Sequence, residues 1–141
     1  MQRIDWVRFI PVSTAVALLV FVLDVVFHGT LAKGMYVGYP SRTPEETMSL
    51  FPFLVLTYLG QLMTFCYLYL KVSPARSKAH AVWWGLWGGL FVMYPNMQFF
   101  VAVRDTSWTL LWAQVTEGIA LTVVTALVFE IFYRPRASHF G

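Results

Sequence analysis

Residues 9–31 read FIPVSTAVALLVFVLDVVFHGTL, and up to Val26 they are almost entirely aliphatic or aromatic. A helix crosses the hydrocarbon core of a bilayer with about 20 predominantly apolar residues, so this segment predicts a membrane-spanning helix. Two ionisable residues, Asp24 and His28, interrupt it four residues apart. Because an ionisable group at such depth is costly, it indicates by default a function or a partner.

Three further segments are similarly long and apolar, at residues 49–71, 80–102 and 109–132. None of them alternates apolar with polar residues as the wall of a membrane barrel does, and helices satisfy their own backbone hydrogen bonds in lipid. We therefore expect an all-α membrane protein, a four-transmembrane-helix bundle that forms one integral membrane domain over residues 1–141. The first segment is longer than the core of a signal peptide, so we expect a retained helix.

The composition agrees with lipid as the main partner. Of the 141 residues, 58% are hydrophobic and 12% are charged, whereas a soluble domain carries about 25% charged residues. The net charge of +3 is small, and the basic residues lie in short loops and tails, so no nucleic-acid partner is expected. Cys66 is the only cysteine, which excludes an intrachain disulfide.

The ends of the segments carry their own signals. Thr43 or Ser49 is expected to cap the second helix, and Thr106 or Ser107 the fourth. Of the ten Lys and Arg residues, seven lie before the first helix, in the second loop or in the tail, and three lie in the first and third loops. Because short cytoplasmic loops are rich in Lys and Arg, both termini are predicted to be cytoplasmic.

With this topology, polar residues of the helices fall in the outer half of the membrane. At about 1.5 Å per residue, Asp24 on the first helix and Glu117 on the fourth are expected at similar depths. Each helix is expected to turn its small and polar face inward, which on the second helix is the face of Thr57, Gln61 and Thr64. The predicted intramembrane polar cluster consists of Asp24, His28, Asn96, Gln98, Gln114 and Glu117.

Three interpretations of Asp24 and His28 remain open. They form a self-neutralising pair that packs against Asn96 or Glu117, a proton- or ion-handling site with Glu117 as second carboxylate, or a metal site with Glu117. We favour the structural pair, since one histidine with carboxylates is a sparse ligand set for zinc or copper. Accordingly no metal and no other cofactor is expected.

Two contacts between helices are also predicted. Gly85 and Gly89 have the spacing that lets two membrane helices approach closely. They form either a dimer seam or, as we favour, an intramolecular contact with the first or second helix. At the cytoplasmic end, Glu130 lies one helical turn from Arg134, which predicts an ion pair between them.

No motif of a common soluble enzyme is present: there is no Gly-x-Ser-x-Gly, no His-Glu-x-x-His and no phosphate-binding glycine loop. We therefore expect a protein that is not an enzyme, namely an accessory or scaffolding subunit of a membrane complex, or a homo-oligomer, without its own reaction centre. The alternative is a small proton- or ion-coupled transporter or channel that uses Asp24, His28 and Glu117. An intramembrane enzyme acting on a lipid or quinone is a third possibility.

Residues 21–34 read FVLDVVFHGTLAKG. This segment resembles the first helix of small four-helix bacterial membrane proteins grouped as domain of unknown function 1761. The helix with Gly85, Gly89 and Pro95 and the fourth helix up to Arg134 fit the same layout. The resemblance implies a four-helix fold in the bacterial inner membrane and little chemistry. Because that family tends to carry an aromatic pair at the position of Phe27 and His28 and no acid at the position of Asp24, it implies no role for Asp24 or His28.

Overall fold

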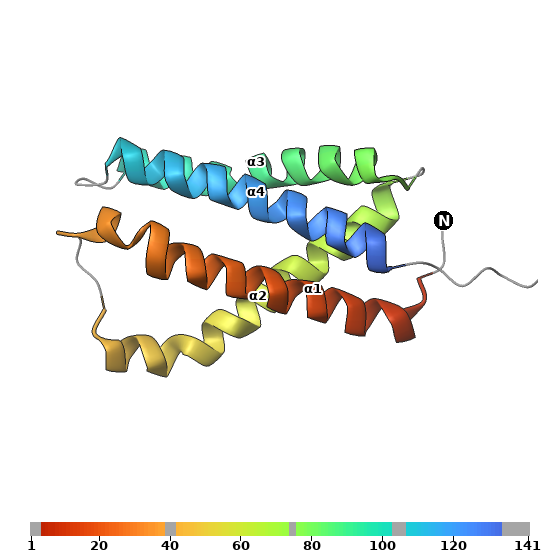
Figure 1. Cartoon of the computed structure of the whole chain (residues 1–141), viewed down its shortest axis with the longest axis horizontal. Coiled ribbons are helices and arrows are strands. Elements are labelled where there is room, and N and C mark those ends of the chain that lie inside the picture. Colours follow the sequence, from red (N-terminus) through yellow and green to blue (C-terminus); the bar gives the residue numbers. More distant parts are fainter. Residues whose placement is uncertain (1–3, 39–41, 74–75, 103–106, 134–141) are drawn as a thin grey trace, which may run out of the picture.

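A computed structural model describes residues 4–38, 42–73, 76–102 and 107–133 of the chain. Every regular element in these ranges is helical (Figure 1). The elements are α1 (Trp6–Val26), the π-helical turn η1 (Phe27–Leu31), the 3-10 turn η2 (Lys33–Tyr36), α2 (Pro44–Val72), α3 (Lys78–Ala102) and α4 (Trp108–Phe132). The predicted all-α class with four long helices is thus confirmed for the described part of the chain.

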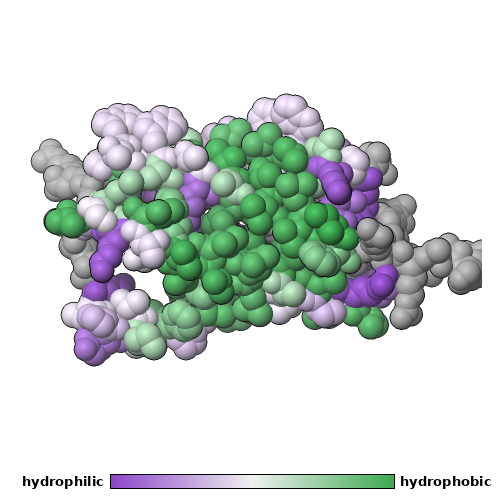
Figure 2. All heavy atoms as spheres, viewed as in Figure 1, coloured by the Kyte–Doolittle hydropathy of each residue, from purple (hydrophilic) through white to green (hydrophobic). Residues whose placement is uncertain are grey.

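Three of the described helical segments are long and apolar enough to cross a membrane: Trp6–Leu31, Pro44–Val72 and Trp108–Phe132. Helix α3 has a comparable length. However, its three glycines, Asn96, Gln98, three tryptophans and one tyrosine lower its mean hydropathy. Figure 2 shows an apolar band across the middle of the visible face, with hydrophilic residues gathered toward the two ends. This distribution is typical of a membrane protein.

Helix α2 begins at Pro44, five residues before the predicted start at residue 49. The cause is a capping box, in which the Thr43 side chain accepts from the Glu46 backbone N–H and the Glu46 carboxylate accepts from the Thr43 N–H. Thr43, one of the two predicted caps, is therefore the N-cap. Ser107 caps α4 by accepting from the Leu110 N–H, also as predicted.

The four helices are tightly packed only at one end of the bundle. Figure 1 shows α2 crossing the other helices and diverging from α3 and α4 at the end where it begins. The core therefore lies toward the opposite end, where Ala17, Val20, Tyr69 and Phe129 are completely buried. At that end the Asp5 backbone N–H donates to the Tyr133 hydroxyl at 3.1 Å, so the first and last described residues lie close together.

Helix α3 packs almost entirely along α4. A Cβ atom at Gly85 would lie 2.4 Å from Val123 Cα, and one at Gly89 would lie 2.7 Å from Ile119 Cα. The glycines therefore form an intramolecular contact, as favoured, but the prediction of the first or second helix as partner was wrong. The Thr122 hydroxyl donates to the Gly85 carbonyl at 2.9 Å, so a polar contact reinforces this close approach.

Among the described residues, Arg76 binds the Glu130 carboxylate. The predicted partner, Arg134, lies outside the described residues. Arg76 Nε donates to Glu130 Oε2 at 2.8 Å, and the Tyr69 hydroxyl donates to the same oxygen at 2.9 Å. Both charged side chains are more than four-fifths buried. Arg76 precedes α3 by two residues, so this pair ties the connection between α2 and α3 to the end of α4.

The second helix buries a different face in the bundle from the one predicted, although Gln61 of the predicted face lines the cavity between the helices. Its buried residues are Leu62, Phe65, Cys66, Tyr69 and Leu70. Thr57, expected inside, is exposed, and its hydroxyl donates to the carbonyls of Phe53 and Leu54 in its own helix. A threonine hydroxyl satisfied in this way needs no partner on another helix, so its polarity did not indicate the inward face.

Candidate functional site

His28 lies in the π-helical turn η1, which follows directly on α1 and is wider than an α-helical turn. The Ala32 backbone N–H donates to the Phe27 carbonyl five residues earlier, at 2.9 Å, and the Thr30 hydroxyl donates to the Val26 carbonyl at 2.6 Å. Single π-helical turns are frequent at functional sites. This turn places the imidazole next to α4, within reach of a second carboxylate.

The His28 imidazole lies between two carboxylates. Its Nε2 atom is 3.6 Å from Asp24 Oδ1, one helical turn earlier, and 3.3 Å from Glu117 Oε2 on α4. The Glu117 side chain is only 8% exposed, whereas those of Asp24 and His28 are about one-quarter and one-third exposed. The predicted meeting of the first-helix acid with the fourth-helix acid is therefore present, with His28 between them.

The other ring nitrogen of His28 contacts Tyr36, which lies on η2. The Tyr36 hydroxyl is 2.6 Å from His28 Nδ1, and Gln114 Nε2 donates to the Tyr36 oxygen at 3.3 Å. Burial raises the pKa of Tyr36, and the carboxylates of Glu117 and Asp24 act in the same direction, although the Gln114 hydrogen bond opposes them. A protonated Tyr36 donates to Nδ1, which leaves the proton of a neutral imidazole on Nε2, facing the carboxylates.

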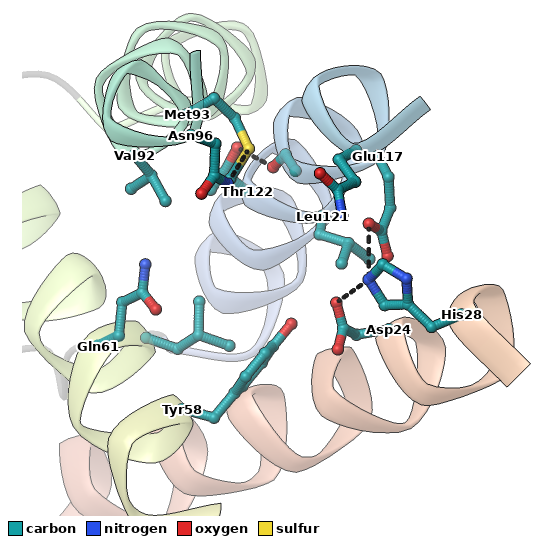
Figure 3. A pocket seen from close by; sticks show the side chains of 13 residues that line it. Asp24, His28, Tyr58, Gln61, Val92, Met93, Asn96, Glu117, Leu121 and Thr122 are labelled. Carbon is teal, nitrogen blue, oxygen red and sulfur yellow. Dashed lines mark hydrogen bonds and ion pairs between the residues drawn. The ribbon is translucent and has the colours of Figure 1, made fainter. Parts of the chain in front are cut away.

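One end of a cavity of about 170 Å³ is lined by Asp24, His28, Gln114 and Glu117. The cavity lies between the diverging part of α2 and the α3–α4 pair, with α1 below it (Figure 3). Tyr58 points toward Asp24, and Asn96 lies across the cavity from His28 (Figure 3). Its lining residues are Asp24, His28, Tyr58, Gln61, Leu62, Val92, Met93, Asn96, Gln114, Glu117, Gly118, Leu121 and Thr122.

Five of the six residues predicted to form the intramembrane cluster therefore line this cavity. Asn96 is exposed to it and donates to Met93 Sδ at 3.5 Å, without contact to the carboxylates. Gln98 is exposed and is not among the lining residues. Asn96 and Gln98 are two positions apart on α3, and residues so spaced point in different directions on a helix.

Sequence reasoning missed the two tyrosines of the site. Tyr36 was assigned to a loop, because no pattern marks a short 3-10 turn that folds back onto the helix before it. Tyr58 lies next to Thr57, and the polar face was assigned to Thr57 instead. The one available signal was spacing, since Tyr58, Leu62, Phe65 and Tyr69 recur every three or four residues as one face of a helix does.

The charges around the cavity are unbalanced. Among the described residues that line it, Asp24 and Glu117 can be negative, and only His28 can be positive. In addition, Glu117 Oε1 is buried and has no hydrogen-bond partner among the described residues. A site with two carboxylates, one imidazole and room for water attracts cations and can exchange protons.

Comparisons of the chain with protein-family models, with curated proteins and with solved structures find no match. The resemblance to domain of unknown function 1761 therefore stays a prediction, and the candidate function depends on the geometry of the site alone.

Proposed function

We propose that this protein is a small integral membrane protein that passes protons or other cations through the cavity, with Asp24, His28 and Glu117 as the binding groups. The observation that carries the proposal is the convergence of two carboxylates on one imidazole at one end of a cavity with no Lys or Arg among its described lining residues. Ionisable residues within membrane helices mark ion pathways and proton relays.

The arrangement of hydrogen-bonding groups suits proton exchange. A continuous series of polar contacts begins at Gln114 on α4, passes through Tyr36 on η2 and His28 on η1, and returns to α4 at Glu117. The imidazole can take up a proton on one ring nitrogen and release one from the other. A proton that arrives from the side of Tyr36 can therefore pass through the ring to Glu117 and the cavity.

The proposal places all four helices across the membrane, with both termini in the cytoplasm. Its support is the close approach of α3 along α4, together with the proximity of Asp5 to Tyr133 at one end of the bundle. An even number of crossings returns the chain to the side where it started. The distribution of Lys and Arg assigns that side to the cytoplasm, and in a bacterium the membrane is the inner membrane.

The test is proton flux into proteoliposomes along a pH gradient, followed with a dye enclosed in the vesicles. Asp24→Asn and Glu117→Gln keep the shape of each side chain and should strongly lower, without abolishing, the protein-dependent flux. Glu45→Gln is the matched control, because Glu45 is an exposed acid in the first turn of α2. Flux that is unchanged in both cluster variants would exclude this function.

A scaffolding role in a membrane complex or homo-oligomer is the second candidate. The observation that favours it is the aromatic ridge of Trp83, Trp87 and Phe91 on α3, whose side chains are each more than 60% exposed. Lipid or another protein can cover such a ridge. A stable monomer without partners after purification in mild detergent would argue against this role.

A further inference from the structure

We infer that Asp24, His28 and Glu117 form a binding site for a divalent first-row metal ion of the Zn²⁺ class. One ligand atom from each residue lies within 4.8 Å of the other two. The inference rests on the proposed cation-handling role of the same cluster and names the chemical class of the cation. It goes beyond that role in assigning a ligand set and a coordination geometry.

The distances match a metal site better than an ion pair. Tetrahedral Zn²⁺ has bonds of about 2.0–2.2 Å to nitrogen and oxygen, which places its ligand atoms about 3.3–3.6 Å apart. His28 Nε2 lies 3.3 Å from Glu117 Oε2 and 3.6 Å from Asp24 Oδ1. Charge-assisted hydrogen bonds are shorter, about 2.7–2.9 Å, and the single Nε2 atom can donate to only one carboxylate at a time.

A second observation points to a bound cation independently of these distances. Only 8% of the Glu117 side chain is exposed, and no described residue donates a hydrogen bond to its Oε1 atom. An unpaired buried carboxylate oxygen is costly, and a divalent ion bound to Glu117 compensates that charge. No Lys or Arg among the described lining residues is available to do so instead.

Tyr36 completes the arrangement as a positioning residue. Histidines that bind metals usually engage a partner through the second ring nitrogen, which fixes the ring and its tautomer. Here His28 Nδ1 lies 2.6 Å from the Tyr36 hydroxyl. When Nε2 binds a metal, Nδ1 carries the ring proton and donates to the Tyr36 oxygen. Three protein ligands leave a fourth position open toward the cavity for water or an anion.

The experiment measures binding of Zn²⁺ and Co²⁺ to the full chain in detergent by calorimetry and by the visible spectrum of Co²⁺. The protein is purified through a tag without histidine. One ion should bind per chain. Asp24→Asn, His28→Gln and Glu117→Gln should each weaken binding by at least about 100-fold, because loss of a residue that only orients a metal ligand already costs about 10–100-fold in affinity. Tyr36→Phe should weaken it by about tenfold.

The controls separate this site from other ligands. The double variant His80→Gln/His139→Gln removes the other histidines and should bind as the parent does. X-ray absorption of the Zn²⁺-loaded parent, which requires no variant to fold, should show one imidazole among oxygen ligands.

Absence of binding, two or more imidazoles, or equal competition by Mg²⁺ would overturn the inference. Proton flux that depends on the cluster without Zn²⁺ binding would contradict the metal site alone, and Zn²⁺ binding without flux would contradict the proposed function alone.

Discussion

His28 Nε2 lies 3.3 Å from Glu117 Oε2, although the two residues are far apart in the sequence. This contact joins the π-helical turn after α1 to α4 at the point where the helices begin to separate. The second oxygen of the same carboxylate is buried and has no partner in the described part of the chain. Thus apolar side chains pack at one end of the bundle. The other end contains the Glu117 carboxylate, whose negative charge is only partly balanced by His28.

The close approach of α3 to α4 should be sensitive to any side chain at its glycines. At Gly85 and Gly89 an added Cβ would meet backbone atoms of Val123 and Ile119, which cannot turn aside. Gly85→Leu and Gly89→Leu should each lower the free energy of unfolding by at least about 1–3 kcal/mol through overpacking. Thermal unfolding in detergent measures the effect. Gly60→Leu is the matched control, because Gly60 is exposed and no atom of the described residues lies within 4 Å of an added Cβ there. An unchanged midpoint for the Gly85 and Gly89 variants would contradict the packing.

Removal of one partner of the Arg76–Glu130 pair should destabilise the protein strongly. Both side chains are largely buried, and an unpaired buried charge costs about 3–5 kcal/mol. Glu130→Gln and Arg76→Met should each show this loss, and the double variant should lose much less than their sum. A double-mutant cycle on the free energy of unfolding gives the coupling. Additive losses would show that Arg76 is not the partner, and a coupling of Glu130 to Arg134 would restore the sequence-based expectation.

Tyr36 should remain protonated to an unusually high pH. Burial and the neighbouring carboxylates raise its pKa above the ordinary value of 10.0, so the folded protein binds this proton more tightly than the unfolded chain does. The stabilisation is present below pH 10 and is lost as the pH rises through the raised pKa. The difference in phenolate absorbance between the parent and Tyr36→Phe during alkaline titration measures it. Appearance of the Tyr36 phenolate below pH 10 would contradict the assigned surroundings.

The four helices could be predicted from the sequence because runs of about 20 apolar residues leave few other structures in lipid. The pairing of Asp24 with Glu117 followed from the rise per residue and the topology. The inward face of α2 could not be predicted from the sequence, because the Thr57 hydroxyl donates to a carbonyl of its own helix. The partner of Gly85 did not follow either, since small residues permit close approach to any helix without selecting one.

The site was partly predictable for a related reason. Ionisable residues stand out in an apolar segment, so Asp24, His28 and Glu117 were found. Tyr36 reaches His28 through two consecutive non-α turns, η1 and η2, and the backbone geometry of such turns is not encoded in a simple period. The metal interpretation, which the sparse ligand set made unattractive, is favoured only once His28 Nε2 is seen 3.3 Å from Glu117 Oε2 and 3.6 Å from Asp24 Oδ1.

The central claim is that His28 and Glu117 act together as one cation site, and its most direct test is the double variant His28→Gln/Glu117→Gln in the proteoliposome flux assay. Residues that act as a unit show strongly non-additive losses. We predict that the double variant loses no more flux than the more impaired single variant. Losses that multiply, as expected for two independent sites, would contradict the claim.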